Sequence, residues 1–274
     1  METTKKVNTI IENNKKVFII PKDDFTQKCF AGDIKVLYNN DIETCNFIAD
    51  TNQIIEVNLP NCISFGGDIS GNQLKTLNMP ICRYIGSSAF RYIGVKNLSL
   101  PYCSYIGASA FYGAEIEIID LPECTQIAAD GFANNKNLKY INLPKLTSIT
   151  NSVFASCTSL ENAIFPTVSS IYSYAFQHCS NLSSLTLAST SVRFGASNCF
   201  IGCLSLETLA FPNAESIANI SSMLLNSTPI YNSTILGYFG SIYVPNNMVS
   251  VLKTASGWSY FSDRITSIDN LPIK

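Results

Sequence analysis

The sequence predicts a repeat solenoid built from short parallel strands. One pattern is written five times between Leu74 and Phe176, and neighbouring copies lie 21 or 22 residues apart. The copies share the prolines Pro80, Pro101, Pro122, Pro144 and Pro166. Self-similarity at a fixed period of about 20 to 29 residues is typical of a leucine-rich-repeat solenoid. We therefore expect a right-handed leucine-rich-repeat solenoid of about eight rungs, each of roughly 20–24 residues, with a cap at each end.

Each repeat carries a short strand directly before its proline. Counted from the proline, positions −6, −3 and −1 are apolar and position −2 is polar, as in Leu138, Ile141, Leu143 and Asn142 before Pro144. Alternation with a period of two indicates a strand with one face toward the core. Proline ends the strand because it lacks the amide hydrogen that another ladder bond needs.

The second half of each repeat supplies further core positions. A small residue or another apolar residue stands at +2, isoleucine at +5 and phenylalanine at +10. The phenylalanines are Phe90, Phe111, Phe132, Phe154 and Phe176. Equivalent positions of a solenoid stack at about the ~4.8 Å spacing of neighbouring strands, so these rings are predicted to form a ladder in the core.

The two ends depart from the pattern and are interpreted as caps. Residues 1–50 form the expected N-terminal cap, in which VNTII and KVFII flank a turn and predict a β-hairpin. The leucine-rich-repeat solenoid occupies residues 51–217. Residues 218–274 form an irregular last rung and the C-terminal cap. The register stays open near residues 188–200 and 218–241, where the period slips.

The C-terminal cap contains a predicted helix and an aromatic lid. MVSVLKTAS favours a short helix with Asn246 or Asn247 as its N-cap. Trp258, Tyr260 and Phe261 follow and are expected to cover the last rung. A solenoid needs such covers because its first and last rungs each have an exposed apolar edge.

Composition excludes several classes of partner. The formal net charge is −2, so the chain has no basic field that would attract nucleic acid. No run of about 18 apolar residues is present, so no membrane insertion is expected. The N-terminus lacks the apolar stretch of a signal peptide. The expected location is therefore cytoplasmic, or surface-associated by a route that needs no signal peptide.

The consensus LxxLxLPxCxxIGxxAFxxCxxL resembles the BspA-like leucine-rich repeats, a type also described from treponemes. The segment YVPNNMVSVLKTASGWSYFSDRI is similar to the terminal segment of such proteins from gut bacteria and their phages. The resemblance covers residues 54–268. It implies a solenoid used for protein binding, often in adhesins at a cell surface.

Seven of the ten cysteines fall into two columns. They are interpreted as small buried hydrophobes rather than as disulfides or ligands. The columns are Cys62, Cys82, Cys103 and Cys124, and Cys157, Cys179 and Cys203. Zinc ligation by His178, Cys179, Cys199 and Cys203 is the alternative. It is disfavoured because residues 178 and 179 should point to opposite sides and no CxxC motif is present. We expect no metal site and no cofactor.

Catalysis is also disfavoured. The single histidine has no nucleophile and acid at recognisable spacing. The carboxylates Glu117, Asp120 and Glu123 gather at one rung, where a solvated surface is the expected role. The chain is therefore predicted not to be an enzyme.

A binding surface is the remaining place for a function, and two candidates stand out. One is the outward strand face at positions −4 and −2, which comprises Glu56, Asn58, Thr76, Asn78, Asn97, Ser99, Ile118, Asp120, Tyr140, Asn142, Asn162 and Ile164. The other is a group of tyrosines, because tyrosine buries a large area at a small entropy cost. The candidate partner-binding residues are Tyr84, Tyr92, Tyr102, Tyr105, Tyr112 and Tyr140. Ordinary packing between adjacent rungs is the alternative role for these side chains.

The predicted function is a non-enzymatic interaction or adhesion module that presents an extended repeat surface to a protein or glycan. The alternative is a structural component of a phage particle or another assembly. The sequence leaves the ligand and the oligomeric state open.

Overall fold

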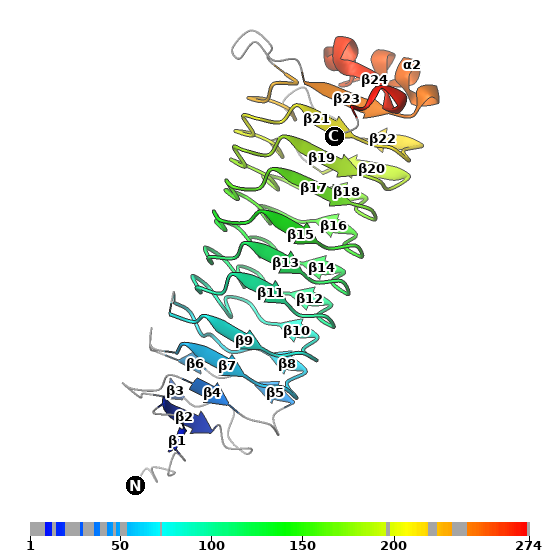
Figure 1. Cartoon of the computed structure of the whole chain (residues 1–274). Coiled ribbons are helices and arrows are strands. Elements are labelled where there is room, and N and C mark those ends of the chain that lie inside the picture. Colours follow the sequence, from blue (N-terminus) through cyan, green and yellow to red (C-terminus); the bar gives the residue numbers. More distant parts are fainter. Residues whose placement is uncertain are drawn as a thin grey trace.

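The computed structural model is an elongated stack of rungs that runs from the N-terminus at one end to a helical cap at the other (Figure 1). It describes residues 54–71, 73–195, 198–218, 224–231 and 240–272. Toward the N-terminus it also describes the shorter segments 9–12, 15–19, 28–29, 36–38, 43–45 and 48–49. Among these residues, no helix is long and apolar enough to cross a bilayer.

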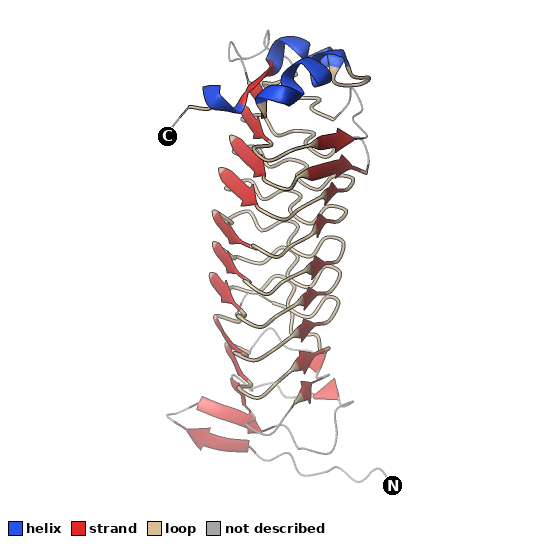
Figure 2. Ribbon diagram, turned by 90° about the vertical axis from the view of Figure 1, so that its right-hand side faces the viewer, coloured by secondary structure: helices blue, strands red, loops and turns tan. Residues whose placement is uncertain are grey.

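Each rung contributes one strand to each of two columns, which run along two sides of the body (Figure 2). The first column consists of β4 (Val36–Tyr38), β7 (Glu56–Asn58), β9 (Thr76–Asn78), β11 (Asn97–Ser99), β13 (Ile118–Asp120), β15 (Tyr140–Asn142), β17 (Asn162–Phe165), β19 (Ser184–Leu187), β21 (Thr208–Ala210) and β23 (Ser241–Val244). The second consists of β5 (Thr44–Cys45), β8 (Ser64–Phe65), β10 (Tyr84–Ile85), β12 (Tyr105–Ile106), β14 (Gln126–Ile127), β16 (Ser148–Ile149), β18 (Ser170–Ile171), β20 (Ser191–Phe194) and β22 (Ser216–Ala218).

Neighbouring rungs pair in parallel and place equivalent positions opposite each other. Asn97 faces Ile118 and Ile118 faces Tyr140, so position −4 stacks on position −4 along the column. The first-column strands end before the proline, as the sequence predicts. The leucine-rich-repeat solenoid is thereby confirmed, with about nine turns rather than eight. The additional turn arises because β4 and β5 lie in register with β7 and β8.

The predicted N-terminal hairpin is present. Strand β1 (Thr9–Glu12) pairs antiparallel with β2 (Lys15–Ile19). Strand β2 then pairs in parallel with β4, so the hairpin continues the first column. A separate two-stranded pair joins β3 (Lys28–Cys29) to β6 (Ile48–Ala49).

The predicted phenylalanine ladder is confirmed as the spine of the core. Ring centroids are 5.6 Å apart between Phe90 and Phe111, 5.3 Å between Phe111 and Phe132, and 6.2 Å between Phe132 and Phe154. The ladder extends beyond the five predicted rings, because Phe65 stacks on Phe90 at 4.6 Å and Phe200 stacks on Phe176 at 5.8 Å. All of these rings are fully buried.

Two left-handed residues flank the ladder phenylalanine in each of several rungs. At +8 and +12 the backbone φ is positive, as at Ser109 (φ 53°) and Gly113 (φ 67°) around Phe111. Most of these positions carry a non-glycine residue, which is expected to cost of order 1 kcal/mol each. Where position +12 is glycine, a ring from the preceding rung occupies the space that a side chain would need. A Cβ added to Gly113 would lie 2.6 Å from the Tyr92 ring, and one added to Gly202 would lie 2.4 Å from the His178 ring.

Side-chain donors from one rung satisfy backbone carbonyls of the rung before it. At position +13, Asn135 Nδ2 donates to the Phe111 carbonyl at 2.8 Å, and the thiols of Cys179 and Cys203 donate to the carbonyls of Phe154 and Phe176, each at 3.0 Å. Buried carbonyls are costly to leave without a partner, so this position favours a small donor.

The surface repeats the same arrangement with hydroxyls. Ser104 donates to the carbonyl of Arg83, Thr125 to that of Ser104, and Thr147 to that of Thr125, over 3.2–3.5 Å. Serine and threonine therefore bridge adjacent rungs at position +3 in this part of the surface. These bridges give a structural role to part of the serine- and threonine-rich surface.

The rung with the two-residue insertion keeps its register toward the preceding rung only. Toward the following rung the pairing is shifted by two residues, because Ile217, the +5 isoleucine after Pro212, pairs with Val192 and not with Phe194. Strand β20 pairs Phe194 with Ile171, so Phe194 takes the place of the +5 isoleucine, and Phe200 takes the ladder position. Phe194 follows Ala188 by six residues where Ile171 follows Pro166 by five, and Phe200 follows Phe194 by six where Phe176 follows Ile171 by five. One extra residue thus lies between Ala188 and Phe194, and the other lies between Phe194 and Phe200.

The C-terminal cap contains α2 (Asn246–Thr254), η1 (Ser259–Arg264), β24 (Ile265–Ser267) and η2 (Ile268–Asn270). The predicted helix is present, but its N-cap is Pro245 and neither asparagine caps it. Trp258 packs edge-on against Phe211 at 6.2 Å, and Phe261 is buried. The expectation that Tyr260 joins this lid is wrong: its side chain is 74% exposed, while Phe261 beside it turns inward.

We expect Phe132→Ala to lower the free energy of unfolding by about 3–5 kcal/mol, because the ring is fully buried between two neighbours in the ladder. Urea unfolding followed by circular dichroism measures the loss. Phe132→Leu is the matched control, since it leaves a smaller cavity and should lose less. Equal stability of Phe132→Ala and the wild type would contradict the role of the ladder.

Asn135→Ala should destabilise the protein by about 1–3 kcal/mol, because the Phe111 carbonyl loses a buried donor. Asn135→Cys should lose less, since a thiol at the equivalent position donates to the preceding rung and the asparagine Oδ1, which has no partner, is removed. Thermal and urea unfolding of both variants test the order. A cysteine variant no more stable than the alanine variant would show that the donor is unimportant.

Candidate functional site: the solenoid surface

The cysteine columns lie in the core. All nine cysteines whose side chains the structure describes are buried and reduced. Burial raises the pKa of Cys124, Cys179 and Cys199 to about 12, so these thiols stay protonated at neutral pH. Protonated thiols without solvent access are poor nucleophiles and poor metal ligands.

The alternative zinc ligands do not converge on one site. His178 is exposed with a left-handed backbone, whereas Cys179 beside it is fully buried, so the two side chains point to opposite sides as expected. Within the described segments, no three histidine, cysteine, aspartate or glutamate side chains are grouped so that they could hold a metal ion.

The clustered carboxylates are engaged in surface pairs. Glu117 accepts from Lys96 at 2.9 Å and lies 3.4 Å from Lys139, and Glu123 lies 2.7 Å from Lys145. The hydrogen bonds from both lysines lower the pKa of Glu117, and the bond from Lys96 has the larger effect. A carboxylate held ionised in this way is unsuited to act as a general acid at neutral pH.

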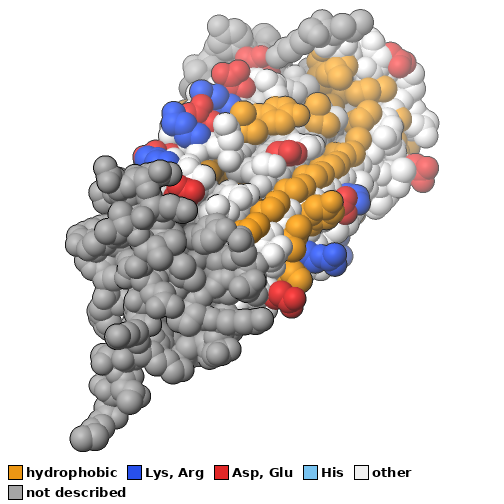
Figure 3. All heavy atoms as spheres, turned by 60° about the horizontal axis from the view of Figure 1, so that its bottom comes forward, with side chains coloured by type: hydrophobic (Ala, Val, Ile, Leu, Met, Phe, Trp, Pro, Cys, Tyr) orange, Lys and Arg blue, Asp and Glu red, His pale blue; other side chains and the backbone are white. Residues whose placement is uncertain are grey.

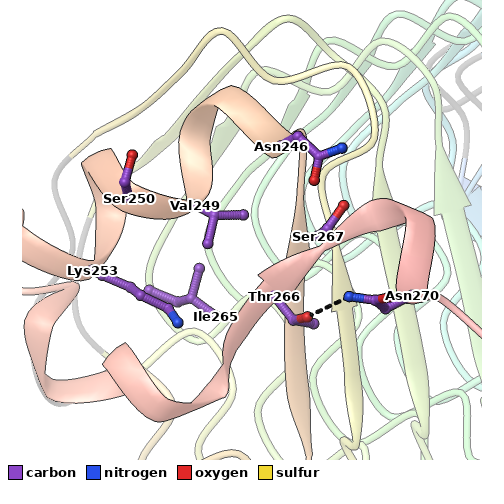
Figure 4. A pocket seen from close by; sticks show the side chains of 8 residues that line it. All are labelled: Asn246, Val249, Ser250, Lys253, Ile265, Thr266, Ser267 and Asn270. Atoms are coloured by element: carbon purple, nitrogen blue, oxygen red, sulfur yellow. Dashed lines mark hydrogen bonds between the residues drawn. The ribbon is translucent and has the colours of Figure 1, made fainter.

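A pocket of about 560 Å³ opens between α2 and β24 in the C-terminal cap (Figure 4). It is lined by Asn246, Val249, Ser250, Lys253, Ile265, Thr266, Ser267 and Asn270. Two of these lining residues are joined, since Asn270 Nδ2 donates to the Thr266 hydroxyl at 3.0 Å. The lining holds one cation and no carboxylate or histidine, so it offers no acid–base pair. None of the predicted partner-binding residues lines it.

Five of the six candidate tyrosines occupy three separate places, and the sixth, Tyr102, lies on the turn directly after Pro101. Tyr84 and Tyr105 lie outward on β10 and β12 in the second column, with parallel rings whose centroids are 4.9 Å apart. Tyr92 and Tyr112 meet edge to face at 5.7 Å, on the turns after the ladder phenylalanines. Tyr140 lies on β15 in the first column.

Tyr92 and Tyr112 are partly engaged in packing between rungs. The Tyr92 ring lies above Gly113, and Asn134 Nδ2 donates to the Tyr112 hydroxyl at the next rung. These two side chains therefore fill the structural role that the sequence leaves as an alternative. They remain at the surface, but on the turn side rather than beside Tyr84.

The stacked pair belongs to a larger apolar surface, which we call the aromatic corner. It consists of Ile63, Ile81, Tyr84, Tyr102 and Tyr105, at positions +1, +3 and +4 of three consecutive rungs, where the chain passes from the first column to the second. Tyr102 is 56% exposed, and Ile63, Ile81 and Tyr84 are each about two fifths exposed. Figure 3 shows hydrophobic side chains gathered in rows along the body. The isoleucines at +1 and +3 are the sequence feature that indicates this surface, and the prediction from tyrosines alone did not include them.

The outward strand face is mostly uncharged and polar. Its amide and carboxylate side chains pair between rungs at position −2: Asn78 donates to Asn58, and Asn142 donates to Asp120, both at 2.7 Å. Large apolar side chains interrupt this face at Ile118, Tyr140 and Ile164, which are all exposed. The face is therefore continuous along the body but chemically uneven.

The family model described as "BspA type Leucine rich repeat region (6 copies)" matches residues 69–182 and 125–244. No curated protein matches the chain. Among solved structures, a leucine-rich-repeat protein from Eubacterium ventriosum is 14% identical, with a TM-score of 0.43, and the match covers 95% of this chain and 82% of that one.

Two further solved structures are similar. A leucine-rich-repeat protein from Bacteroides ovatus is 15% identical, with a TM-score of 0.34 and coverage of 96% of this chain and 98% of that one. A leucine-rich cell surface protein from Faecalibacterium prausnitzii is 10% identical, with a TM-score of 0.31 and coverage of 78% of this chain and 94% of that one.

Stability should fall as the pH rises from about 9 to about 12. Thiols ionise near pH 9 in the unfolded chain, whereas Cys124 and Cys179 stay protonated in the folded core up to about 12. The stability that these buried, protonated thiols contribute is fully present below pH 9. Between pH 9 and 12 the free energy of unfolding falls by about 1.4 kcal/mol per pH unit for each thiol. Urea unfolding at several pH values measures this slope.

The double variant Cys124→Ala, Cys179→Ala is the control for that slope. All other titratable side chains are the same in both proteins, so only the contribution of these two thiols differs. The variant should lose stability less steeply between pH 9 and 12. Identical slopes would contradict the raised thiol pKa values.

Proposed function

Because the chain belongs to the BspA-type leucine-rich-repeat family, we propose that it is a non-enzymatic interaction or adhesion module that binds a partner protein through the aromatic corner. The stacked pair of Tyr84 and Tyr105 is the observation that carries this proposal. Leucine-rich-repeat proteins generally act as binding scaffolds, which supports a role in protein interaction.

The stacked pair stands on a rigid base. Ile85 and Ile106, next to the two tyrosines on the same strands, are fully buried and in register. Gly86 and Gly107 follow, and their backbones approach so closely that a Cβ on Gly107 would lie 2.5 Å from Gly86. A surface held in this way loses little conformational entropy on binding, so its contact area converts more fully into affinity.

The composition of the aromatic corner fits a protein partner. Tyrosine and arginine are enriched at protein interfaces, and exposed apolar patches mark interaction sites. Arg83 is exposed between Ile63 and Ser104 in the +3 column, at the edge of the stacked pair. The proposed partner surface therefore combines apolar area with an acidic residue opposite Arg83.

The test begins with capture of partners from cell-surface and cytosolic fractions, followed by binding measurements on each purified partner. Tyr84→Ala, Tyr105→Ala should weaken binding about 10- to 100-fold, as expected when two central aromatic contacts are truncated. The matched control is Tyr172→Ala, Tyr174→Ala, which removes two exposed tyrosines from a distant rung and should leave binding unchanged. A purified partner that binds the Tyr84, Tyr105 variant as tightly as the wild type would refute the proposal.

A further inference from the structure

A second surface of different chemistry lies on the first column, and we call it the β13–β15 block. It consists of Ile118 and Asp120 on β13 and of Tyr140 and Asn142 on β15. Ile118 faces Tyr140 and Asp120 faces Asn142 in the parallel register. The block therefore has an apolar row beside a polar row, with all four side chains on the outward face.

The dimensions of the block follow from strand geometry. Neighbouring strands are about 4.8 Å apart, and residues two positions apart on one strand are separated by about 6.6 Å. The two rows thus cover an area of the size of one or two six-membered sugar rings. Tyr140 is 59% exposed and Ile118 40% exposed, so the apolar row is open to a ligand.

The polar row is pre-arranged to bind hydroxyl groups. Asn142 Nδ2 donates to Asp120 Oδ1 at 2.7 Å, which fixes the two planar groups side by side. Among the described residues, the second oxygen of Asp120 and the amide oxygen of Asn142 have no partner. A ligand that offers two neighbouring hydroxyl donors would satisfy both oxygens.

The charges around the block balance. Lys96 and Lys139 pair with Glu117 along one edge, and Lys145 pairs with Glu123 along the other. With Asp120, the three lysines face three carboxylates, so the formal charge of the surface is zero. This balance favours an uncharged ligand that forms hydrogen bonds over a phosphate, a nucleic acid or an acidic polymer.

We propose that the β13–β15 block binds a neutral saccharide. The apolar C–H face of one sugar ring packs on Tyr140 and Ile118, and two neighbouring hydroxyls donate to Asp120 and Asn142. A protein partner fits this block less well, because a stable protein interface needs about 800 Å² on each side and the block offers two large apolar side chains. The site is separate from the aromatic corner and does not depend on it.

Titration calorimetry and saturation-transfer NMR test the proposal on the full chain. The probes are the methyl glycosides of glucose, galactose, mannose and N-acetylglucosamine, with maltose and lactose as disaccharides. At least one should bind with a dissociation constant of about 1 mM, the range expected for a shallow site with few contacts. Tyr140→Ala and Asp120→Ala should each weaken that binding about tenfold or more.

Three control variants make the result specific. Tyr140→Phe keeps the ring and should bind as the wild type does, which separates loss of stacking from loss of folding. Asn162→Ala, on the adjacent strand, should also bind normally, as should Tyr84→Ala, Tyr105→Ala. Absence of binding by every probe, or equal binding by wild type and Tyr140→Ala, would overturn the proposal. A protein that requires Tyr140, with no saccharide bound, would overturn it as well.

Discussion

The hydrogen bonding between parallel rungs is the constraint on which the rest of the structure depends. In-register pairing places each residue directly above its equivalent in the next rung, as Tyr84 above Tyr105 and Ile85 above Ile106. A residue type that recurs in the sequence therefore becomes a continuous column in space. The phenylalanine ladder, the buried thiols and the surface hydroxyl bridges are all columns of this kind.

The same constraint explains how much the sequence predicts. The strands, the proline boundaries and the ladder follow from a repeat that the sequence displays openly, and the structure confirms them. The exposure of Tyr260 was predicted wrongly, because the cap lies outside the repeat and periodicity says nothing about which of two neighbouring aromatics turns inward. The left-handed backbone at residues such as Ser109 and Asp130 does not follow from the sequence, because serine and aspartate at a turn do not reveal the sign of φ.

The candidate surfaces show a second limit. Sequence spacing places Tyr84, Tyr92 and Tyr102 close together in the chain, but position within the rung decides which side of the body a residue faces. Tyr92 lies on the turn side above Gly113, whereas Tyr84 stacks with Tyr105 on the second column. Conversely, Asp120 and Asn142 are 22 residues apart in the chain and share a hydrogen bond. Repeat position therefore groups surface residues more accurately than chain distance does.

The side-chain bridges between rungs have a direction. Asn135, Cys179, Ser104 and Thr125 each belong to a later rung and donate to a carbonyl of an earlier one. Each rung thus provides backbone carbonyl acceptors, and the side chains that donate to them come from the rung that follows it in the chain. Because a ribosome releases the chain from its N-terminus, each newly synthesised rung completes the hydrogen bonding of the one already assembled. The solenoid is therefore suited to grow rung by rung in the order of translation.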